Sequence, residues 1–227
     1  EATGALLCLD VTEEVVDEAI ETGCNLIVSH HPLIFKGVKS ITGKDYVERC
    51  IMKAIANGIV IYSAHTNLDN ARGGVNFKMA EKLGLKDVRV LEPKEWKGGE
   101  AGAGVMGMLE QPETETGFLT RLKETFGVGC VKHGRLTGRT IQKVALCGGS
   151  GAFLMGKAQE EGADVFVTGE VKYHDYFYYD GALLVAEIGH YESEQYTKEI
   201  FYSIIRDMFP GLDIRMTRVN TNPIKYL

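Results

Sequence analysis

Three short stretches of the sequence carry residue types that bind divalent metal ions. His190 and Glu194 are four residues apart in a segment with a helical pattern, so on a helix they would share one face. An imidazole and a carboxylate aimed at one point suit a divalent metal. Two upstream stretches offer the same chemistry, and the full set is Ser29-His30-His31-Pro32, His65-Thr66-Asn67-Leu68-Asp69 and Gly189-His190-Tyr191-Glu192-Ser193-Glu194.

Each stretch alone also has an ordinary structural interpretation. The adjacent histidines could be two unrelated structural side chains, and Asp69 could cap the glycine turn that follows it. The pair on the helix could be a solvated face or a simple hydrogen bond. Four of the six histidines nevertheless fall in these stretches. The candidate ligands exceed one tetrahedral site and fit two ions bridged by a carboxylate or water; they are His30, His31, His65, Asp69, His190 and Glu194.

Other residues could line the same pocket and move protons. The candidates for acid–base work are Glu192, Glu170 and His174, although capping and hydrogen bonding would explain the last two equally well. The Gly148–Gly151 turn could cradle a phosphate, but it lacks a Walker or dinucleotide-binding pattern, so a tight turn is favoured. The aromatic residues at 173–179 could stack a base or pack between domains or subunits.

Alternating strands and helices must position these residues. Apolar runs predict strands at 5–9, 26–28, 59–62, 104–109, 141–146, 164–168 and 183–188, and another near 130. Helical patterns lie between them at 13–22, 44–57, 74–82, 115–126, 152–161 and 192–208. The pattern is typical of mostly parallel sheets flanked by helices, in which ligands bind beyond the carboxyl ends of the strands. We expect all the candidate ligands to lie at one such edge.

The length of 227 residues allows one large domain or two small ones. The glycine-rich, charged stretch 93–104 is the candidate boundary, and the chain is expected to return to the first unit near its end. This predicts a metal-site α/β domain at 1–100 plus 185–227, and a second α/β domain at 101–184.

Composition narrows the class of protein. A net charge of −6 weighs against nucleic acid as a partner, and no apolar run is long enough to span a membrane. The five cysteines are scattered without a Cys-x-x-Cys pair, as expected for reduced thiols. From these reduced thiols we expect a cytoplasmic protein, and no signal peptide is evident at the start of the sequence.

The same motifs resemble a known family over nearly the whole chain. The sequence is similar to the Nif-three-like proteins (Ngg-one-interacting factor three), often named GTP cyclohydrolase I type 2 homologues. The resemblance is carried by four motifs in order: Leu26-Ile27-Val28-Ser29-His30-His31-Pro32-Leu33-Ile34-Phe35, Ala64-His65-Thr66-Asn67-Leu68-Asp69, Thr168-Gly169-Glu170 with Tyr173-His174-Asp175, and Gly189 to Glu194.

That resemblance implies two α/β units around a dinuclear metal site and a ring-like hexamer built from dimers. It places metal ligands at His30, His31, Asp69, His190 and Glu194, with His65 as a further ligand or a neighbour of the site. The resemblance also leads us to expect a helical stretch upstream of residue 1, and no site residue is assigned there. Some carry an inserted domain in mid-chain, for which the 93–104 connection leaves no room.

Two functional hypotheses follow from these motifs. The first is a hydrolase that uses two divalent ions (zinc, iron, manganese, cobalt or nickel) on a nucleotide or on a phosphoester or ring-amide substrate. The alternative is a metal-binding oligomeric scaffold or interaction protein, with a protein or nucleic-acid partner and no catalysis.

Overall fold

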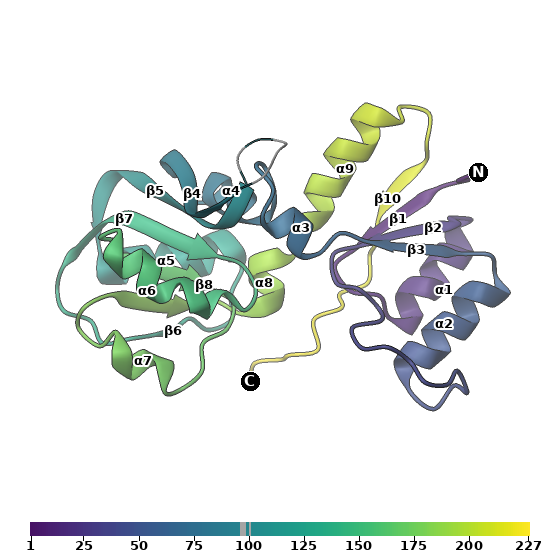
Figure 1. Cartoon of the computed structure of the whole chain (residues 1–227), viewed down its shortest axis with the longest axis horizontal. Helices are drawn as coiled ribbons and strands as arrows, with labels where there is room; N and C mark the ends of the chain where they lie inside the picture. Colours follow the sequence, from purple (N-terminus) through teal and green to yellow (C-terminus); the bar gives the residue numbers. More distant parts are fainter. Residues whose placement is uncertain (96–98, 100) are drawn as a thin grey trace. The chain divides into compact units, whose positions relative to one another are not determined.

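Two separate β-sheets organise the chain. The computed structural model describes residues 1–95, 99 and 101–227. These residues form two compact units (Figure 1). Unit 1 comprises Glu1–Asn67 and Thr197–Lys225, and unit 2 comprises Leu68–Tyr196 and Tyr226–Leu227. Unit 1 is therefore built from the two ends of the chain, and the segment inserted between them forms almost all of unit 2.

Unit 1 contains a four-stranded parallel sheet in the order β10-β1-β2-β3. Its strands are β1 (Ala5–Cys8), β2 (Leu26–Ser29), β3 (Val60–Ser63) and β10 (Ile214–Met216). Helices α1 (Glu13–Thr22) and α2 (Tyr46–Ala56) lie on one face of the sheet, and α9 (Thr197–Met208) lies on the other (Figure 1). Since both faces are covered, β1 is buried at every position, as its unbroken apolar run predicts.

Local signals determine where the helices of unit 1 begin and end. The Thr12 side chain accepts a hydrogen bond from the Val15 amide and caps the start of α1. Gly23 ends this helix in the left-handed conformation, with φ of 72°. The apolar face of α1 then packs with α2 and the sheet around Leu6, Val16 and Cys50.

Unit 2 contains a six-stranded mixed sheet in the order β4-β5-β7-β8-β9-β6. Three central strands are parallel, namely β7 (Thr140–Cys147), β8 (Val165–Thr168) and β9 (Leu184–Glu187). The antiparallel strands are β4 (Lys86–Lys94), β5 (Ala101–Thr114) and β6 (Lys132–His133). The helical segments are α3 (Thr66–Asp69, at the junction with unit 1), α4 (Val75–Lys82), α5 (Glu115–Phe126), η1 (Gly151–Leu154), α6 (Met155–Glu160), α7 (Asp175–Tyr178) and α8 (His190–Glu194).

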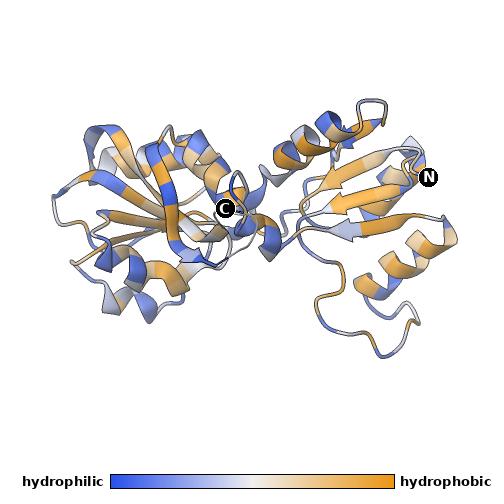
Figure 2. Cartoon of the chain, turned by 45° about the horizontal axis from the view of Figure 1, so that its top comes forward, coloured by the Kyte–Doolittle hydropathy of each residue, from blue (hydrophilic) through white to orange (hydrophobic). Residues whose placement is uncertain are grey.

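Two apolar clusters cover the two faces of the second sheet. One contains Phe118 and Leu122 of α5 with Val144, and the other contains Met155 of α6 with Ala145. Neighbouring residues of β7 therefore enter different clusters, which follows from the alternation of side chains along a strand. Figure 2 shows the resulting concentration of apolar residues in the strands.

The predicted fold class is confirmed: the protein has two α/β units with helices on the sheets, one sheet parallel and the other mixed. The units, however, divide the chain at 67/68 and 196/197, whereas the predicted domains were 1–100 plus 185–227 and 101–184. Part of the predicted boundary, residues 96–98 and 100, lies outside the described residues. On either side of it, Lys94 pairs with Ala101, so β4 and β5 are neighbours in one sheet.

Some expected elements differ from those observed. The last strand predicted from the sequence, β9, pairs with β8 of the second sheet and does not return to the first unit. The expectation that all candidate ligands follow strands of one sheet edge is therefore wrong, because His30 and His65 follow strands of the first sheet and His190 follows one of the second. The predicted 192–208 helix is two helices, α8 and α9. None of the helices in the described part of the chain is long and apolar enough to cross a membrane.

Candidate metal centre

Three histidines of unit 1 form a compact cluster. His30 and His31 directly follow β2, and His65 lies just beyond β3, which pairs in parallel with β2 through Ser29 and Ser63. The ring centroids are 4.9, 5.3 and 5.5 Å apart. One nitrogen from each ring lies within 4.8 Å of the others, so the cluster could hold a metal ion. The parallel register of two neighbouring strands is what brings the three imidazoles together.

Hydrogen bonds set the tautomers of two of these histidines. His30 Nδ1 lies 2.9 Å from the carbonyl oxygen of Ala64, and because a carbonyl can only accept, Nδ1 carries the proton. His31 Nδ1 lies 2.7 Å from Asp10 Oδ1, a carboxylate that likewise accepts. In the neutral rings, the Nε2 atoms therefore keep their lone pairs. This is the arrangement found when an outer carboxylate or carbonyl orients a metal-binding histidine.

Asp10 was not among the residues selected from the sequence. It follows β1, which neighbours β2, so it reaches the same edge of the first sheet. Its second oxygen, Oδ2, accepts a hydrogen bond of 2.7 Å from Thr221 Oγ1 in the C-terminal segment. The sequence does place Asp10 directly after a predicted strand, but this position does not indicate which residue its carboxylate contacts.

A second set of donors lies in unit 2. His190 Nε2 is 3.1 Å from Glu194 Oε2, as expected for residues four apart on α8. Carboxylate oxygens of Glu194 and Asp69 lie within 4.8 Å of each other. Two ionised carboxylates this close repel each other, and the burial of Glu194 adds a desolvation cost. A divalent cation bound between them would offset both the repulsion and that cost.

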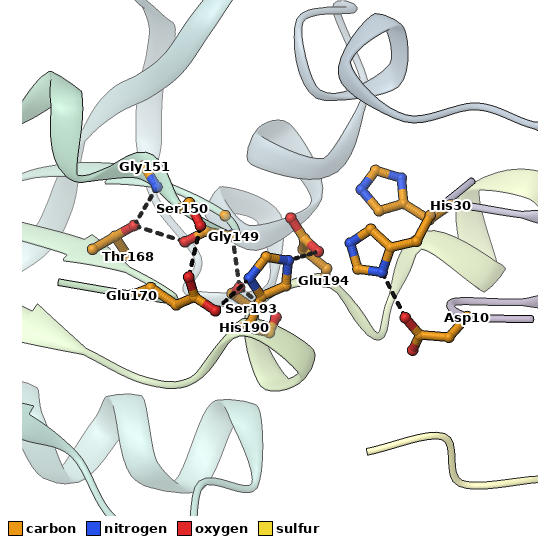
Figure 3. Close-up of polar contacts among 12 residues, drawn as sticks. Asp10, His30, Gly149, Ser150, Gly151, Thr168, Glu170, His190, Ser193 and Glu194 are labelled. Carbon is orange, nitrogen blue, oxygen red and sulfur yellow. Dashed lines mark hydrogen bonds and ion pairs between the residues drawn. The ribbon is translucent and has the colours of Figure 1, made fainter. Parts of the chain in front are cut away.

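His190 is oriented in the same manner as the histidines of unit 1. Its Nδ1 donates to Glu170 Oε1 at 2.9 Å, and Ser150 Oγ donates to the other oxygen of that carboxylate at 2.7 Å (Figure 3). The hydrogen bond from Ser150 holds the pKa of Glu170 below its ordinary value, against the opposing effect of burial, and a protonated His190 would lower it further. Glu170 is therefore the predicted proton-transfer residue that the structure brings to a candidate ligand.

The Gly148–Gly151 turn supports the second donor set. Its amides at Gly148, Gly149 and Gly151 donate to the side chains of Asn76, Ser193 and Thr168, respectively. They are therefore already engaged and do not form a phosphate cradle. A Cβ atom at position 149 would lie 2.3 Å from Glu194 Oε1, so only glycine leaves room for this carboxylate. The turn interpretation is thus the one that the structure supports.

The position of Asp69 depends on tight backbone packing. Asn76 Nδ2 donates to the backbone oxygen of Asp69 at 2.9 Å, and Asn76 also accepts from the glycine turn. A Cβ atom at Gly74 would lie 1.8 Å from the Leu68 oxygen, so the loop after Asp69 can close only with glycine there. Asn76, like Ser150, was not selected from the sequence, because neither its spacing nor its type indicated a role.

The other two predicted proton-transfer residues occupy different surroundings. Glu192 is buried, and its Oε2 would lie 2.2 Å from a Cβ atom at Gly189, so its carboxylate packs against the backbone where α8 begins. His174 is exposed and precedes α7, and its ring lies 5.2 Å from that of Tyr173 and 6.2 Å from that of Phe177.

Comparison with known proteins agrees with this structure. A profile of the DUF34/NIF3 family (NGG1p interacting factor 3) matches residues 1–223. The chain belongs to the DUF34/NIF3 family. The resemblance predicted from the four motifs is thereby confirmed.

The relatives in the DUF34/NIF3 family cover most of the chain. A Clostridium perfringens protein is 37% identical over 85% of this chain and 73% of its own length. A Lactococcus lactis protein is 33% identical over 98% of this chain and 85% of its own length, and both are named GTP cyclohydrolase 1 type 2 homolog. The crystal structure of a Staphylococcus aureus hypothetical protein has a TM-score of 0.92 and 31% identity, covering 100% of this chain and 88% of that one.

Proposed function

We propose that this protein is a metal-dependent hydrolase that uses two divalent ions. The observation that carries the proposal is the orientation of His30, His31 and His190. Each Nδ1 faces a carbonyl or carboxylate that accepts its proton, which makes Nε2 the ring nitrogen that would bind a metal. At His190, Nε2 lies 3.1 Å from Glu194 Oε2, and a cation shared by these two atoms would hold the pair together. A chance cluster of histidines does not need this shared arrangement, whereas it is the usual one for imidazole ligands of a metal.

The proposed ligands are the six residues selected from the sequence. His30, His31 and His65 would supply imidazole nitrogens, and His190 would supply a fourth. Asp69 and Glu194 would supply carboxylate oxygens and offset the charge of the ions. When bound, the two ions would lower the pKa of a coordinated water and polarise an electrophilic phosphorus or ring carbon.

The surrounding residues would manage protons and orientation. Glu170 accepts from His190 and would keep that ring in the tautomer that presents Nε2. Asp10 would do the same for His31. Among the predicted acid–base residues, Glu170 is the one we assign to proton exchange with substrate, because it also faces a cavity lined by Ser150.

The names of the relatives support a first choice of substrate class. The name of the Clostridium and Lactococcus proteins refers to a GTP cyclohydrolase, so hydrolysis of a nucleotide at its phosphate or its ring is the first activity to test.

We further propose a homo-oligomer, a hexamer built from dimers, that acts in the cytoplasm.

Metal content tests the proposal most directly. Protein purified without chelator or affinity metal would be analysed by plasma mass spectrometry, together with Asp69→Ala, Glu194→Ala and the exposed control Glu124→Ala. We expect about two metals per chain in the native protein and the control, with loss in the two site variants. Native protein with fewer than one metal per chain, or site variants that retain the native content while folded, would overturn the proposal.

Activity is tested separately on the metal-loaded protein. Nucleotides, phosphoesters and cyclic amides would be screened with the metal found, and the site variants would serve as blanks. We expect turnover of at least one class that is absent in both variants. Metal binding without any turnover would remove the hydrolase part and favour the interaction protein.

A further inference from the structure

A cavity of about 660 Å³ lies in unit 2 beside the hydrogen-bonded pair of Glu170 and His190. Its volume falls within the range of small-molecule sites, roughly 300–1,000 Å³. It lies beyond the carboxyl ends of the three parallel strands, since Ser150 follows β7, Glu170 follows β8 and Glu187 ends β9. This is the edge at which α/β sheets bind ligands. The cavity is formed by unit 2 alone.

The charged groups of the cavity select a ligand that donates hydrogen bonds. Glu170 and Asp175 face it as carboxylates, and Lys172 contributes one positive charge. A third carboxylate, Glu187, is already engaged, because it accepts from Lys132 and from Tyr176, the latter at 3.1 Å. Without Glu187, the charged groups that face the cavity are still mainly acidic. The cavity therefore favours an organic cation or a neutral N–H donor over an anion.

The geometry at Glu170 narrows the ligand further. Oε1 accepts from His190 and Oε2 accepts from Ser150, so each oxygen of a fixed carboxylate has one partner. A carboxylate has about four lone-pair sites in total, which leaves acceptor capacity on both oxygens. A ligand with two parallel N–H groups on one rigid edge would donate a hydrogen bond to each carboxylate oxygen at the same time. Figure 3 shows Ser150 and His190 on the Glu170 carboxylate.

Aromatic side chains supply a surface for a flat ligand. Phe153 and Tyr178 line the cavity and are 70% and 79% exposed, and Tyr179 lines it as well. Exposed rings of this size are costly to leave in water, and they stack on flat rings and attract cations. The cavity therefore combines stacking surfaces with an acidic, two-oxygen acceptor.

We propose that this cavity binds a planar organic base through an N–C–N edge, of the amidine, guanidine or 2-aminoheterocycle type. The edge bonds to Glu170, and the ring lies against Phe153 and Tyr178. The binding site itself needs no metal. Its role as the substrate pocket rests on the proposed function, since Glu170 also contacts His190, a proposed metal ligand.

Three probes of nearly equal shape test this site. Benzamidine is a cation with an N–C–N edge, benzamide is neutral with one amide nitrogen, and benzoate is an anion. Binding would be measured by calorimetry and by NMR line broadening of the probe, on protein as purified and again after chelator treatment. We expect benzamidine to bind about tenfold or more tightly than benzamide, because its bonds to a carboxylate are charge-assisted at both nitrogens. Benzoate should not bind.

Variants locate the binding. Glu170→Gln should remove the preference for benzamidine, and Tyr178→Ala, at an exposed side chain, should weaken benzamidine about fivefold or more through lost stacking. Glu124→Gln changes the charge equally at an exposed position of α5 and should leave binding unchanged. Thermal unfolding would check that each variant is folded.

The outcomes separate this inference from the proposed function. Equal binding of benzamidine and benzamide, no binding of benzamidine, an unchanged preference in folded Glu170→Gln, or an unchanged benzamidine affinity in folded Tyr178→Ala would each overturn the inference, whatever the metal content. A benzamidine preference that persists after chelator treatment would support it even if the native protein proved to hold no metal.

Discussion

The Asp10→Asn substitution tests whether the orientation of His31 matters for metal binding. In the native protein, Asp10 Oδ1 accepts from His31 Nδ1 at 2.7 Å and Oδ2 accepts from Thr221 at 2.7 Å. Asparagine keeps the shape but removes the charge from the bond to the imidazole. Loss of such an outer carboxylate costs about 10- to 100-fold in metal affinity. Because the Asp10 side chain is 33% exposed, we expect the low end, about tenfold or ~1.4 kcal/mol.

The affinity would be measured for Zn²⁺ by competition with a chromophoric chelator at constant pH and ionic strength. Asp17→Asn is the matched control, since it makes the same charge change in unit 1 at a carboxylate that pairs with Lys53. Thr221→Val leaves the Asp10–His31 bond in place and should cost about two- to threefold. Native affinity in Asp10→Asn, or an equal loss in Asp17→Asn, would refute the inference that Asp10 orients a ligand.

Three further predictions concern stability. Gly74→Ala should lower the free energy of unfolding by about 1–3 kcal/mol or more, because its Cβ atom would meet a backbone oxygen at 1.8 Å. Gly37→Ala, with nothing within 4 Å, is the control in urea unfolding. Backbone hydrogen bonding from Thr42 lowers the pKa of Glu48 from 4.5 to about 2, so Glu48→Gln should lower the Tm at pH 7. That difference should shrink as the pH falls below about 4.5 towards 2, and a difference independent of pH would contradict the assignment. Phe118→Ala, in the core of unit 2, should cost about 3–5 kcal/mol in urea unfolding followed by circular dichroism, and a loss below 1 kcal/mol would contradict its burial.

Helix boundaries were predictable where both ends carry local signals. The helix predicted at 115–126 has those bounds in the structure, since Thr114 caps its start and Gly127 ends it in the left-handed conformation. The break between α8 and α9 was missed because neither glycine nor proline marks it between Glu194 and Thr197. The periodicity of apolar residues indicates which face of a helix is buried, but it does not indicate which of the two cores that face packs against.

Which sheet a strand joins was harder to predict than whether a segment forms a strand. The apolar run at 183–188 predicts a buried strand correctly, but the residues of a central strand in either sheet would look alike. Strand β4 was missed because charged residues such as Lys86 and Arg89 interrupt it, and its register with β5 shifts between them. Its pairing depends on contacts with β5 that no local pattern reveals.

The chemistry of the site was predictable in part. Residue type and spacing selected His30, His31 and His65, which two neighbouring parallel strands bring together. Asp10, Ser150 and Asn76 were not selected, because their roles consist of one or two hydrogen bonds each, most of them to segments distant in the sequence. Common polar residues carry such roles without any distinctive pattern in the sequence.

The discontinuity of unit 1 has a consequence for how the chain folds during synthesis. All six strands of the second sheet lie between Lys86 and Glu187, so unit 2 can complete its sheet while the ribosome is still making the end of the chain. The first sheet, in contrast, waits for β10, which pairs with β1 across almost the entire sequence. Until then, one side of β1 lacks its neighbour and exposes an edge that could pair with another chain. Prior folding of the inserted segment shortens the effective loop between the two ends of unit 1 and lowers the entropic cost of closing it.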